Sequence, residues 1–318
     1  MRRFLFLLVV GLFANAVAAQ PQREPCPVPG EDNAFLGIQT VRLWPGPAPE
    51  AKGTSCWDVP TMTIFEPQGG RGNGSAVVVF PGGAYVGLAA NLEGGQVAEW
   101  FTARGFRAFV ISYRLSSHGY ILPVPLLDAR RAIQTVRARA VDYGIDPHRI
   151  VLIGFSAGGH LAALASTQPV PGNPDAEDPI ARVSSRPDYL VLGYPWIGAI
   201  STDTSHLSYC KLFHVMDRCE ELRKAYSPDL FVTKDTPPTF WYHTFNDETV
   251  PVEQGLRFYE ALVKAGVPAE AHIFAKGHHG TGLGSGDASL DQWPVLLETW
   301  LRAHDLFTQA KTSEMETK

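Results

Sequence analysis

A serine set between an apolar run and a stretch of small residues limits the folds open to this chain. The heptapeptide GFSAGGH, residues 154–160, follows the run IVLI and opens onto the helix-competent stretch LAALA. A buried strand that turns at once into a helix explains this pattern, and such a turn holds its serine in a strained backbone conformation. Gly154 and Gly158 carry no Cβ, so the strand and the helix can approach closely. The sequence therefore predicts a nucleophile elbow at Ser156.

Apolar runs and helical patterns alternate along most of the sequence. The expected strands are 61–65, 76–80, 108–113, 150–155, 189–195, 239–244 and 269–274. The expected helices are 93–103, 126–141, 252–264 and 291–306. This alternation is typical of parallel strands joined by crossover helices. No linker divides the region, so we expect one α/β domain over residues 61–306.

A serine nucleophile needs an imidazole to accept its proton and a carboxylate to orient that imidazole. In an open α/β sheet the acid and then the histidine follow the serine, each at the carboxyl end of a later strand. Asp247 comes just after strand 239–244, where Val250 and Pro251 turn the chain into the next helix. We prefer Asp247 to the neighbouring Glu248, because its shorter side chain suits a fixed hydrogen bond.

The loop after the last expected strand reads AKGHHGTGLG and presents two adjacent histidines. A general base is expected in a flexible loop after the last strand, where it can reach the serine. We assign this role to His279, directly before Gly280, in preference to His278. We expect His243, which lies inside strand 239–244, to pack into the sheet.

Acyl transfer also needs backbone N–H groups that stabilise an oxyanion. Strand 76–80 ends in PGGAY, residues 81–85, whose glycines let the backbone face a substrate. The position after this strand matches that of an oxyanion loop. We therefore expect the oxyanion donors to be the N–H groups of Gly83 and Ala84, together with that of Ala157 beside the serine.

The charge balance excludes one large class of partner. The chain has 27 Lys and Arg against 32 Asp and Glu, a net charge of −5 that leaves no basic surplus for phosphate backbones. The arginines that do cluster lie along the expected helix 126–141, at Arg130, Arg131, Arg137 and Arg139. We interpret them as a solvated helix face and expect no nucleic-acid partner.

The N-terminus has the three regions of a secretory signal. Two arginines precede the apolar run 4–13, and small residues at 16–19 form a cleavage pattern before Gln20. The run is shorter than a membrane span requires. We expect a signal peptide at 1–19, a Pro-rich segment at 20–60 that packs on the domain, and a disordered tail at 307–318. The protein would be secreted or periplasmic, with no membrane attachment after signal removal.

Export makes the four cysteines interpretable, because an oxidising compartment favours disulfides. Proximity along the chain favours Cys210 with Cys219 and Cys26 with Cys56, although free thiols remain an alternative. Zinc is poorly supported because no two cysteines have CxxC spacing. The adjacent histidines have no further ligand group at a suitable spacing, so we expect no metal site.

The motifs described above occur together with further segments that are similar to one family. These segments are LWPGPAP, FRAFVISYRL, LLDARRAI, GIDPHRI, TPPTFWYHTFNDETVPVEQ and FAKGHHGTGL. The chain resembles the α/β-hydrolase esterases that include bacterial acetylxylan esterases and feruloyl-type esterases, over nearly all of its length after residue 19. The resemblance implies an α/β-hydrolase fold, with a mostly parallel sheet of about eight strands, helices on both faces and a short insertion after the sixth strand. It also implies a Ser156, Asp247 and His279 triad without a cofactor.

Two departures from the family pattern bear on substrate preference more than on chemistry. The histidine loop commonly reads GGHGF in the family, whereas here it reads GHHGT, so that His278 replaces a glycine and Thr281 an aromatic residue. The oxyanion loop commonly reads PGGGY or HGGG, whereas here it reads PGGAY, which makes Ala84 a mild substitution.

The segment 196–236 is expected to form a cap-like insertion over the strand ends, where substrates bind. It is short and polar, so we expect no large apolar lid. Tyr85 and Trp196 are candidate walls of a substrate pocket, and Trp196 is equally well explained as a core residue.

We therefore expect a secreted serine carboxylesterase that hydrolyses short acyl esters through an acyl-enzyme. The resemblance favours acetyl or feruloyl groups on plant polysaccharide or sugar, so the partner would be a small-molecule or carbohydrate ester. Two alternatives stay open. One is a serine peptidase similar to prolyl oligopeptidase, although such peptidases usually carry a large propeller domain that we do not find in this sequence. The other is a catalytically silent binding module with the same fold.

Overall fold

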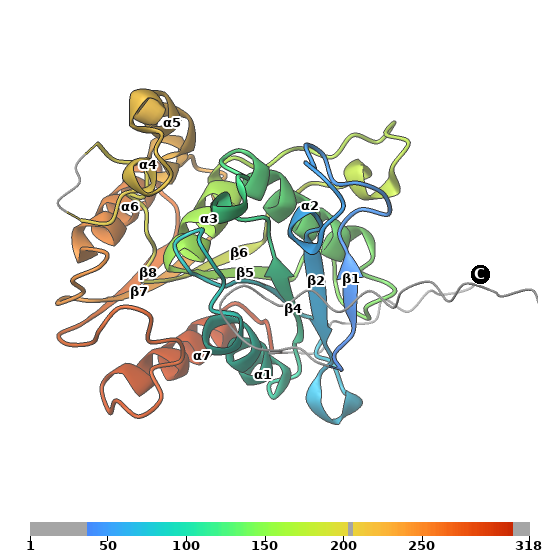
Figure 1. Cartoon of the computed structure of the whole chain (residues 1–318). Helices are drawn as coiled ribbons and strands as arrows, with labels where there is room; N and C mark the ends of the chain where they lie inside the picture. Colours follow the sequence, from blue (N-terminus) through green and yellow to red (C-terminus); the bar gives the residue numbers. More distant parts are fainter. Residues whose placement is uncertain (1–36, 203–205, 308–318) are drawn as a thin grey trace, which may run out of the picture.

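The structure of the protein, a computed structural model, describes residues 37–202 and 206–307 (Figure 1). The predicted signal peptide at 1–19, most of the predicted tail and Cys26 lie outside the described residues.

One sheet of eight strands organises the domain. The strands are β1 (Thr40–Arg42), β2 (Thr61–Phe65), β3 (Ala76–Phe80), β4 (Arg107–Ser112), β5 (Ile150–Phe155), β6 (Tyr189–Gly193), β7 (Thr239–Thr244) and β8 (Ala269–Phe274). Their order across the sheet is β1-β2-β4-β3-β5-β6-β7-β8. The pairs from β4 to β8 are all parallel, whereas β2 pairs antiparallel with both β1 and β4. The predicted mostly parallel sheet is confirmed.

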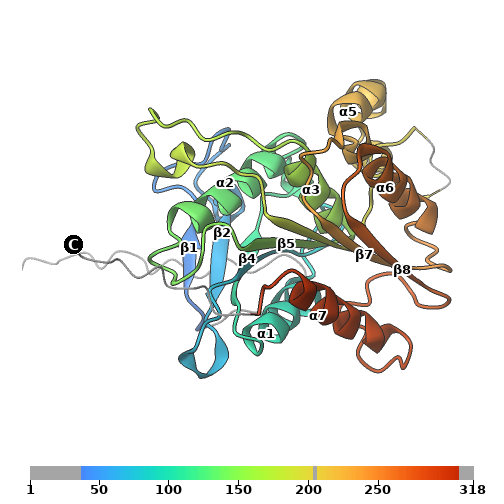
Figure 2. The same ribbon diagram turned by 180° about the vertical axis from the view of Figure 1, so that it is seen from behind.

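Helices cover both faces of the sheet, as predicted. The α-helices are α1 (Gln96–Thr102), α2 (Val124–Ala138), α3 (Ser156–Thr167), α4 (Tyr209–Leu212), α5 (Cys219–Tyr226), α6 (Val252–Ala265) and α7 (Trp293–Ala303). A π-helical segment, η3 (Ala90–Gly95), leads directly into α1. Figures 1 and 2 show α1 and α7 together below the sheet, whereas α2, α3 and α6 lie on its other face.

The core has one apolar cluster on each face of the sheet. All five residues of β3 are buried, and their side chains alternate between the clusters: Val78 and Phe80 pack toward α2 and α3, whereas Val77 and Val79 pack toward α1 and α7. A continuous apolar run is what a central parallel strand covered on both faces requires. This burial fixes the strand ends, and therefore the loops that follow them, as a rigid platform.

The segment before β2 joins the domain through a strand that the sequence did not reveal. Residues 40–42 form β1, an edge strand of three residues. Its central residue, Val41, is only half-buried and its two outer residues are exposed, so the apolar pattern is weak. The next residue, Leu43, is buried in the core and its N–H donates to the Pro60 carbonyl at 3.1 Å. Arg114 holds the same segment through a hydrogen bond to the Pro49 carbonyl at 2.6 Å. The described part of the Pro-rich segment thus packs on the domain.

The predicted solvated arginine face of α2 is wrong for Arg130, Arg131 and Arg137, whereas Arg139, just after the helix, is exposed as predicted. Arg131 is buried, donates to the Leu43 carbonyl at 2.8 Å and pairs with Asp178. Arg137 donates to the Ser184 carbonyl at 2.7 Å. The segments that contain Leu43 and Ser184, both far away in the sequence, cover this face of the helix. The arginine guanidinium groups donate hydrogen bonds to the backbone carbonyl groups of these segments.

The insertion that follows β6 carries α4, α5 and two short 3₁₀ helices, η6 (Met216–Arg218) and η7 (Pro228–Phe231). A disulfide joins Cys210 to Cys219, nine residues apart, which matches the predicted pairing. The Cys26–Cys56 pairing stays a prediction, because Cys26 is outside the described residues. No helix within residues 37–202 and 206–307 has the length and apolarity of a membrane span.

Candidate active site

Ser156 stands at the junction of β5 and α3, the first residue of the helix. Its φ is +51°, in the left-handed region that costs a non-glycine residue about 1–3 kcal/mol. The residue is 6 % exposed and therefore buried. The strained turn predicted from the heptapeptide is therefore present.

Steric contact explains the two glycines of the elbow. A Cβ on Gly154 would lie 2.3 Å from the Gly158 carbonyl oxygen, and a Cβ on Gly158 would lie 2.1 Å from the Phe80 carbonyl oxygen. Both distances are far inside van der Waals contact. Strand β5, helix α3 and the loop after β3 can meet only because these two positions are glycine.

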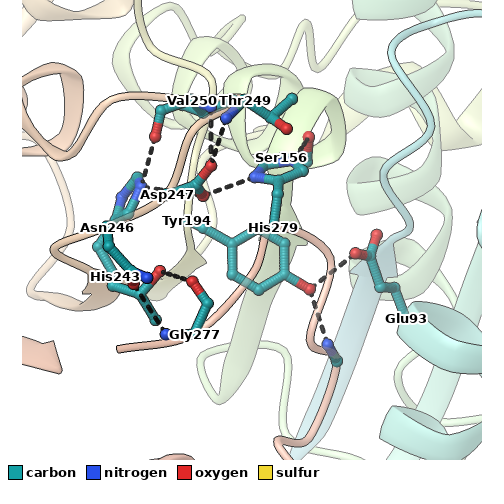
Figure 3. A network of polar contacts seen from close by, with 12 residues as sticks. Glu93, Ser156, Tyr194, His243, Asn246, Asp247, Thr249, Val250, Gly277 and His279 are labelled. Carbon is teal, nitrogen blue, oxygen red and sulfur yellow. Dashed lines mark hydrogen bonds and ion pairs between the residues drawn. The ribbon is translucent and has the colours of Figure 1, made fainter. Parts of the chain in front are cut away.

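The three predicted side chains form one hydrogen-bonded chain (Figure 3). The Ser156 Oγ lies 2.7 Å from His279 Nε2, and His279 Nδ1 lies 2.7 Å from Asp247 Oδ2. An ionised carboxylate only accepts, so Nδ1 carries the proton and Nε2 is free to accept from the serine hydroxyl. Residues from the ends of β5, β7 and β8 thus meet at the same edge of the sheet.

Asp247 is held as an ionised acceptor. Its Oδ1 accepts the N–H groups of Thr249 and Val250, both at 2.9 Å. Burial alone raises the pKa of this carboxyl, but hydrogen bonds from His243, His279 and the Val250 N–H outweigh that effect and hold the pKa well below its ordinary value. The carboxylate can therefore orient and stabilise a charged imidazole throughout the neutral range.

The alternative acid and base, Glu248 and His278, lie outside the hydrogen-bonded series of Ser156, His279 and Asp247. Glu248 and His278 are both exposed, whereas Asp247 is buried and His279 is partly buried. His243 is fully buried in β7, as predicted, but its Nε2 also lies 3.4 Å from Asp247 Oδ2. Asp247 and His279 are thus the residues that the structure brings to Ser156. His243 is a second histidine beside the acid.

The predicted oxyanion loop lies against the serine. A Cβ placed on Gly82 would be 2.9 Å from Ser156 Cβ. The loop continues through three residues of positive φ, namely Gly83 at +130°, Ala84 at +54° and Tyr85 at +58°. The Gly83 carbonyl accepts the N–H groups of Val86 and Gly87 at 2.9 and 3.0 Å. These bonds hold a conformation that the chain would not keep by itself.

The N–H groups of Gly83, Ala84 and Ala157 remain the predicted oxyanion donors. Within the described ranges, no protein acceptor takes the N–H of Gly83 or of Ala84. Ala157 belongs to the first turn of α3, where backbone N–H groups have no acceptor inside the helix. These three N–H groups therefore belong to the two segments that flank the Ser156 side chain.

The two predicted pocket residues are buried. Tyr85 and Trp196 are both 0 % exposed, and Tyr85 donates its hydroxyl to His160 Nδ1 at 2.9 Å. Neither side chain presents surface to a substrate in this conformation. For Trp196 this burial agrees with the alternative that it is a core residue.

Sequence reasoning missed two polar residues that touch the site from inside. Glu93 is 3 % exposed and Tyr194 is 1 % exposed, and they share a hydrogen bond of 2.7 Å near the serine. Their separation of 101 residues leaves no local pattern that could reveal the contact. Among residues 37–202 and 206–307, no three His, Cys, Asp or Glu side chains are grouped as metal ligands.

Two protein families match successive parts of the chain. The BD-FAE family matches residues 62–182, which contain the oxyanion loop and the elbow. The prolyl oligopeptidase family matches residues 190–304, which contain Asp247 and His279.

The curated relatives include larger proteins. An acetylxylan esterase of Xylanibacter ruminicola is 31% identical over 246 residues, which are 76% of this chain and 48% of that protein. The endo-1,4-beta-xylanase B of Butyrivibrio fibrisolvens is 31% identical over 231 residues, 68% of this chain and 35% of that protein. The chain thus spans half or less of the length of these relatives.

Two solved structures match more than four fifths of this chain. An acetyl ester-xyloside bifunctional hydrolase from Caldicellulosiruptor lactoaceticus has a TM-score of 0.74 and 36% identity, covering 84% of this chain and 97% of that one. A propionate-bound thermophilic esterase from Thermogutta terrifontis has a TM-score of 0.68 and 28% identity, covering 87% and 97%. Fold and sequence agree with the resemblance seen in the motifs. The chain therefore belongs to the α/β-hydrolase esterases, the family that includes bacterial acetylxylan esterases.

Proposed function

We propose that this protein is a serine carboxylesterase in which Ser156, His279 and Asp247 form the catalytic triad. The observation that carries the proposal is the hydrogen-bonded chain from the serine hydroxyl through the imidazole to the buried carboxylate. Nucleophile, base and orienting acid each lie within hydrogen-bond distance of the next, which is the geometry that activation of a serine hydroxyl needs.

The reaction proceeds in two halves. His279 Nε2 takes the proton from Ser156 as the Oγ attacks the ester carbonyl, and the oxyanion is stabilised by the N–H groups of Gly83, Ala84 and Ala157. The imidazolium then protonates the leaving alcohol as the acyl-enzyme forms. Water, deprotonated by His279, attacks the acyl group, and the acid leaves as Ser156 regains its proton.

The proposed substrates are short acyl esters, with acetyl or feruloyl groups on plant polysaccharide or sugar as the favoured class. The names of the relatives support this class, since one is an acetylxylan esterase and another acts as an acetyl ester-xyloside hydrolase. The Thermogutta terrifontis esterase has been solved with propionate and with butyrate bound, which supports a small acyl site. The α-helices of the insertion, α4 and α5, have four and eight residues, and we infer that the insertion forms a small cap.

The compartment is part of the same proposal. The signal-like N-terminus predicts export, and the Cys210–Cys219 disulfide is of the kind that an oxidising compartment maintains. A polysaccharide substrate would be met in the same place, outside the cytoplasm. Sequencing the N-terminus of protein recovered from the culture medium or periplasm tests this step, and a chain that still begins at Met1 in the cytoplasm would contradict it.

A kinetic comparison tests the function. The enzyme and a Ser156→Ala variant are assayed on p-nitrophenyl esters of increasing chain length and on acetylated and feruloylated xylan. We expect hydrolysis that falls steeply beyond butyrate, with kcat reduced by at least about 10⁴-fold in the variant. Equal unfolding temperatures show that the variant is folded. Undiminished hydrolysis by Ser156→Ala would overturn the assignment.

A peptidase function is the second candidate, because the prolyl oligopeptidase family matches residues 190–304. The same triad can cleave an amide when the leaving amine is protonated by the histidine. Peptide anilides with proline before the scissile bond discriminate the two functions. Anilide turnover with kcat/KM comparable to that on p-nitrophenyl acetate would favour the peptidase, and ester turnover alone would favour the esterase.

A further inference from the structure

A buried carboxylate connects the two loops that flank the serine. Glu93, in the π-helical segment η3, accepts the Gly82 N–H at Oε2 over 2.6 Å. Its Oε1 accepts the Tyr194 hydroxyl over 2.7 Å (Figure 3). The side chain is only 3 % exposed. A charge removed from water in this way is costly unless it is hydrogen-bonded, so its two oxygens must find donors and hold them firmly.

Tyr194 carries the connection to the histidine loop. Its hydroxyl donates to Glu93 and accepts the Gly282 N–H at 2.9 Å, three residues after His279. The Tyr194 ring also meets the His279 ring edge-on, with centroids 5.0 Å apart. Burial and the neighbouring Glu93 raise the pKa of Tyr194 well above its ordinary value, so the hydroxyl keeps the proton that it donates.

The Gly82 N–H connects the oxyanion loop to the Glu93 carboxylate. A Cβ on Gly82 would lie 2.6 Å from Glu93 Oε2 and 2.9 Å from Ser156 Cβ, so this residue is held between the carboxylate and the nucleophile. Its N–H points to Glu93, and the next two N–H groups, of Gly83 and Ala84, are left without an acceptor within residues 37–202 and 206–307. A loop with consecutive positive φ values needs such an outside support.

We propose that Glu93 is a positioning residue for the proposed esterase reaction: its carboxylate holds the oxyanion loop through Gly82 and the histidine loop through Tyr194. The inference rests on the proposed function. It differs from a purely structural role because the two contacts end on the loops that carry the oxyanion donors and the base. Loss of the carboxylate should therefore weaken transition-state binding more than substrate binding.

Two variants separate the two contacts. Glu93→Gln keeps the size of the side chain but offers one acceptor oxygen, so the Gly82 N–H and the Tyr194 hydroxyl can no longer both be accepted. Tyr194→Phe removes the hydroxyl that connects Glu93 to the histidine loop and keeps the Gly82 bond. Glu99→Gln is the matched control, since Glu99 is exposed on the adjoining helix α1. Each variant is compared with the full-length enzyme and with Ser156→Ala on p-nitrophenyl acetate.

The expected result is a loss confined to the chemical step. We expect Glu93→Gln to lower kcat by about 10- to 100-fold with KM changed less than about 3-fold, and Tyr194→Phe to give a smaller loss of the same kind. A trifluoromethyl ketone, whose adduct with the serine Oγ places a negative oxygen at the donor N–H groups, should bind Glu93→Gln more weakly by the same factor. The double variant should lose less than the product of the single losses, because both act through one carboxylate.

The outcomes that overturn the inference are distinct from those that overturn the function. If Ser156→Ala is inactive but Glu93→Gln keeps full kcat and inhibitor affinity while losing only thermal stability, Glu93 is structural and the inference fails. If Ser156→Ala stays active, the proposed function itself fails. If Glu93→Gln does not fold, Tyr194→Phe decides: an unchanged kcat and inhibitor affinity reject the inference, and a parallel loss of both supports it.

Discussion

The imidazole of His243 lies against the carboxylate of Asp247, with Nε2 3.4 Å from Oδ2. The same Nε2 is 2.9 Å from the Val250 carbonyl oxygen, which only accepts, so Nε2 carries the proton. The N–H edge of the ring is thus turned toward the acid and toward the loop that holds it. His243 was expected to pack into the sheet, and it does so, but it also supports the orienting acid of the proposed triad.

Replacement of His243 tests this support. His243→Gln keeps an N–H donor near the Val250 carbonyl and should leave kcat within about 3-fold, whereas His243→Leu removes the donor and should lower kcat by about 10-fold. The loss follows from a looser Asp247 loop rather than from a missing reactive group, so KM should stay constant. Steady-state kinetics on p-nitrophenyl acetate measure the difference. Equal kcat values in the two variants would show that the N–H donor has no role.

Close contact at Gly158 gives a second prediction. Gly158→Ala would place a Cβ 2.1 Å from the Phe80 carbonyl oxygen and 2.5 Å from that of Pro81, so the backbone before the oxyanion loop must move. We expect a loss of about 3 kcal/mol or more in the free energy of unfolding and a fall of about 10²-fold in kcat. Urea denaturation and kinetics give the two numbers.

Gly266→Ala is the control for backbone strain alone. Gly266 ends α6 with φ +73°, but nothing lies within 4 Å of its added Cβ. Its substitution should cost about 1 kcal/mol and leave kcat unchanged. A similar effect of both substitutions on kcat would mean that the contact with the Phe80 carbonyl does not position the oxyanion loop.

Most of the sheet could be predicted from the sequence because its strands are buried on both faces. The run Ile150–Phe155 is fully buried, so its apolar residues are continuous and unmistakable. Strand β1 is the counterexample, since a three-residue edge strand with two exposed residues has no pattern to read. The exposure predicted for the arginines of α2 was wrong for a related reason. The segments that bury Arg131 contain Leu43 and Asp178, which are far from it in sequence.

In the candidate site, too, some contacts could be predicted from the sequence and others could not. Ser156, Asp247 and His279 could be predicted because chain topology brings the ends of successive parallel strands to one edge, so order along the chain implies proximity. The contact between Glu93 and Tyr194 follows no such rule. It depends on the side-chain direction of a π-helical residue and on the backbone turn after β6, where Tyr194 has φ +33°. Neither is encoded in a local pattern of residues.

The disulfide of the insertion gives a third prediction. Cys210 and Cys219 are nine residues apart, and closing a loop of that length stabilises a protein by about 2–3 kcal/mol through the unfolded chain. The Cys210→Ser, Cys219→Ser double variant should lose about this much stability, with kcat at 25 °C within about 3-fold, because the triad residues lie on other elements. Peptide mapping without reduction checks the bond itself, and two free thiols would contradict it.

His160 gives the last prediction, which concerns pH. It is fully buried one turn after the serine, with Nε2 2.9 Å from the Tyr226 carbonyl oxygen and Nδ1 2.9 Å from the Tyr85 hydroxyl. The Tyr226 carbonyl only accepts, so Nε2 carries a proton, and in the neutral ring that burial favours Nδ1 accepts the Tyr85 hydroxyl. Burial lowers the pKa of His160 from 6.5 to about 4.

The sign of the effect follows from proton binding. Between pH 6.5 and about 4 the unfolded chain binds the His160 proton and the folded chain does not, so this group's contribution to stability is complete above pH 6.5 and is lost as the pH falls to about 4. The loss is about 3 kcal/mol in the free energy of unfolding. Asp128, whose pKa burial raises to about 6, acts in the opposite direction, but it is present in both proteins and cancels in a comparison with His160→Gln. Urea denaturation at pH 7, 5.5 and 4.5 should show that the wild type loses stability relative to the variant as the pH falls, and parallel curves would mean that His160 is charged in the folded protein.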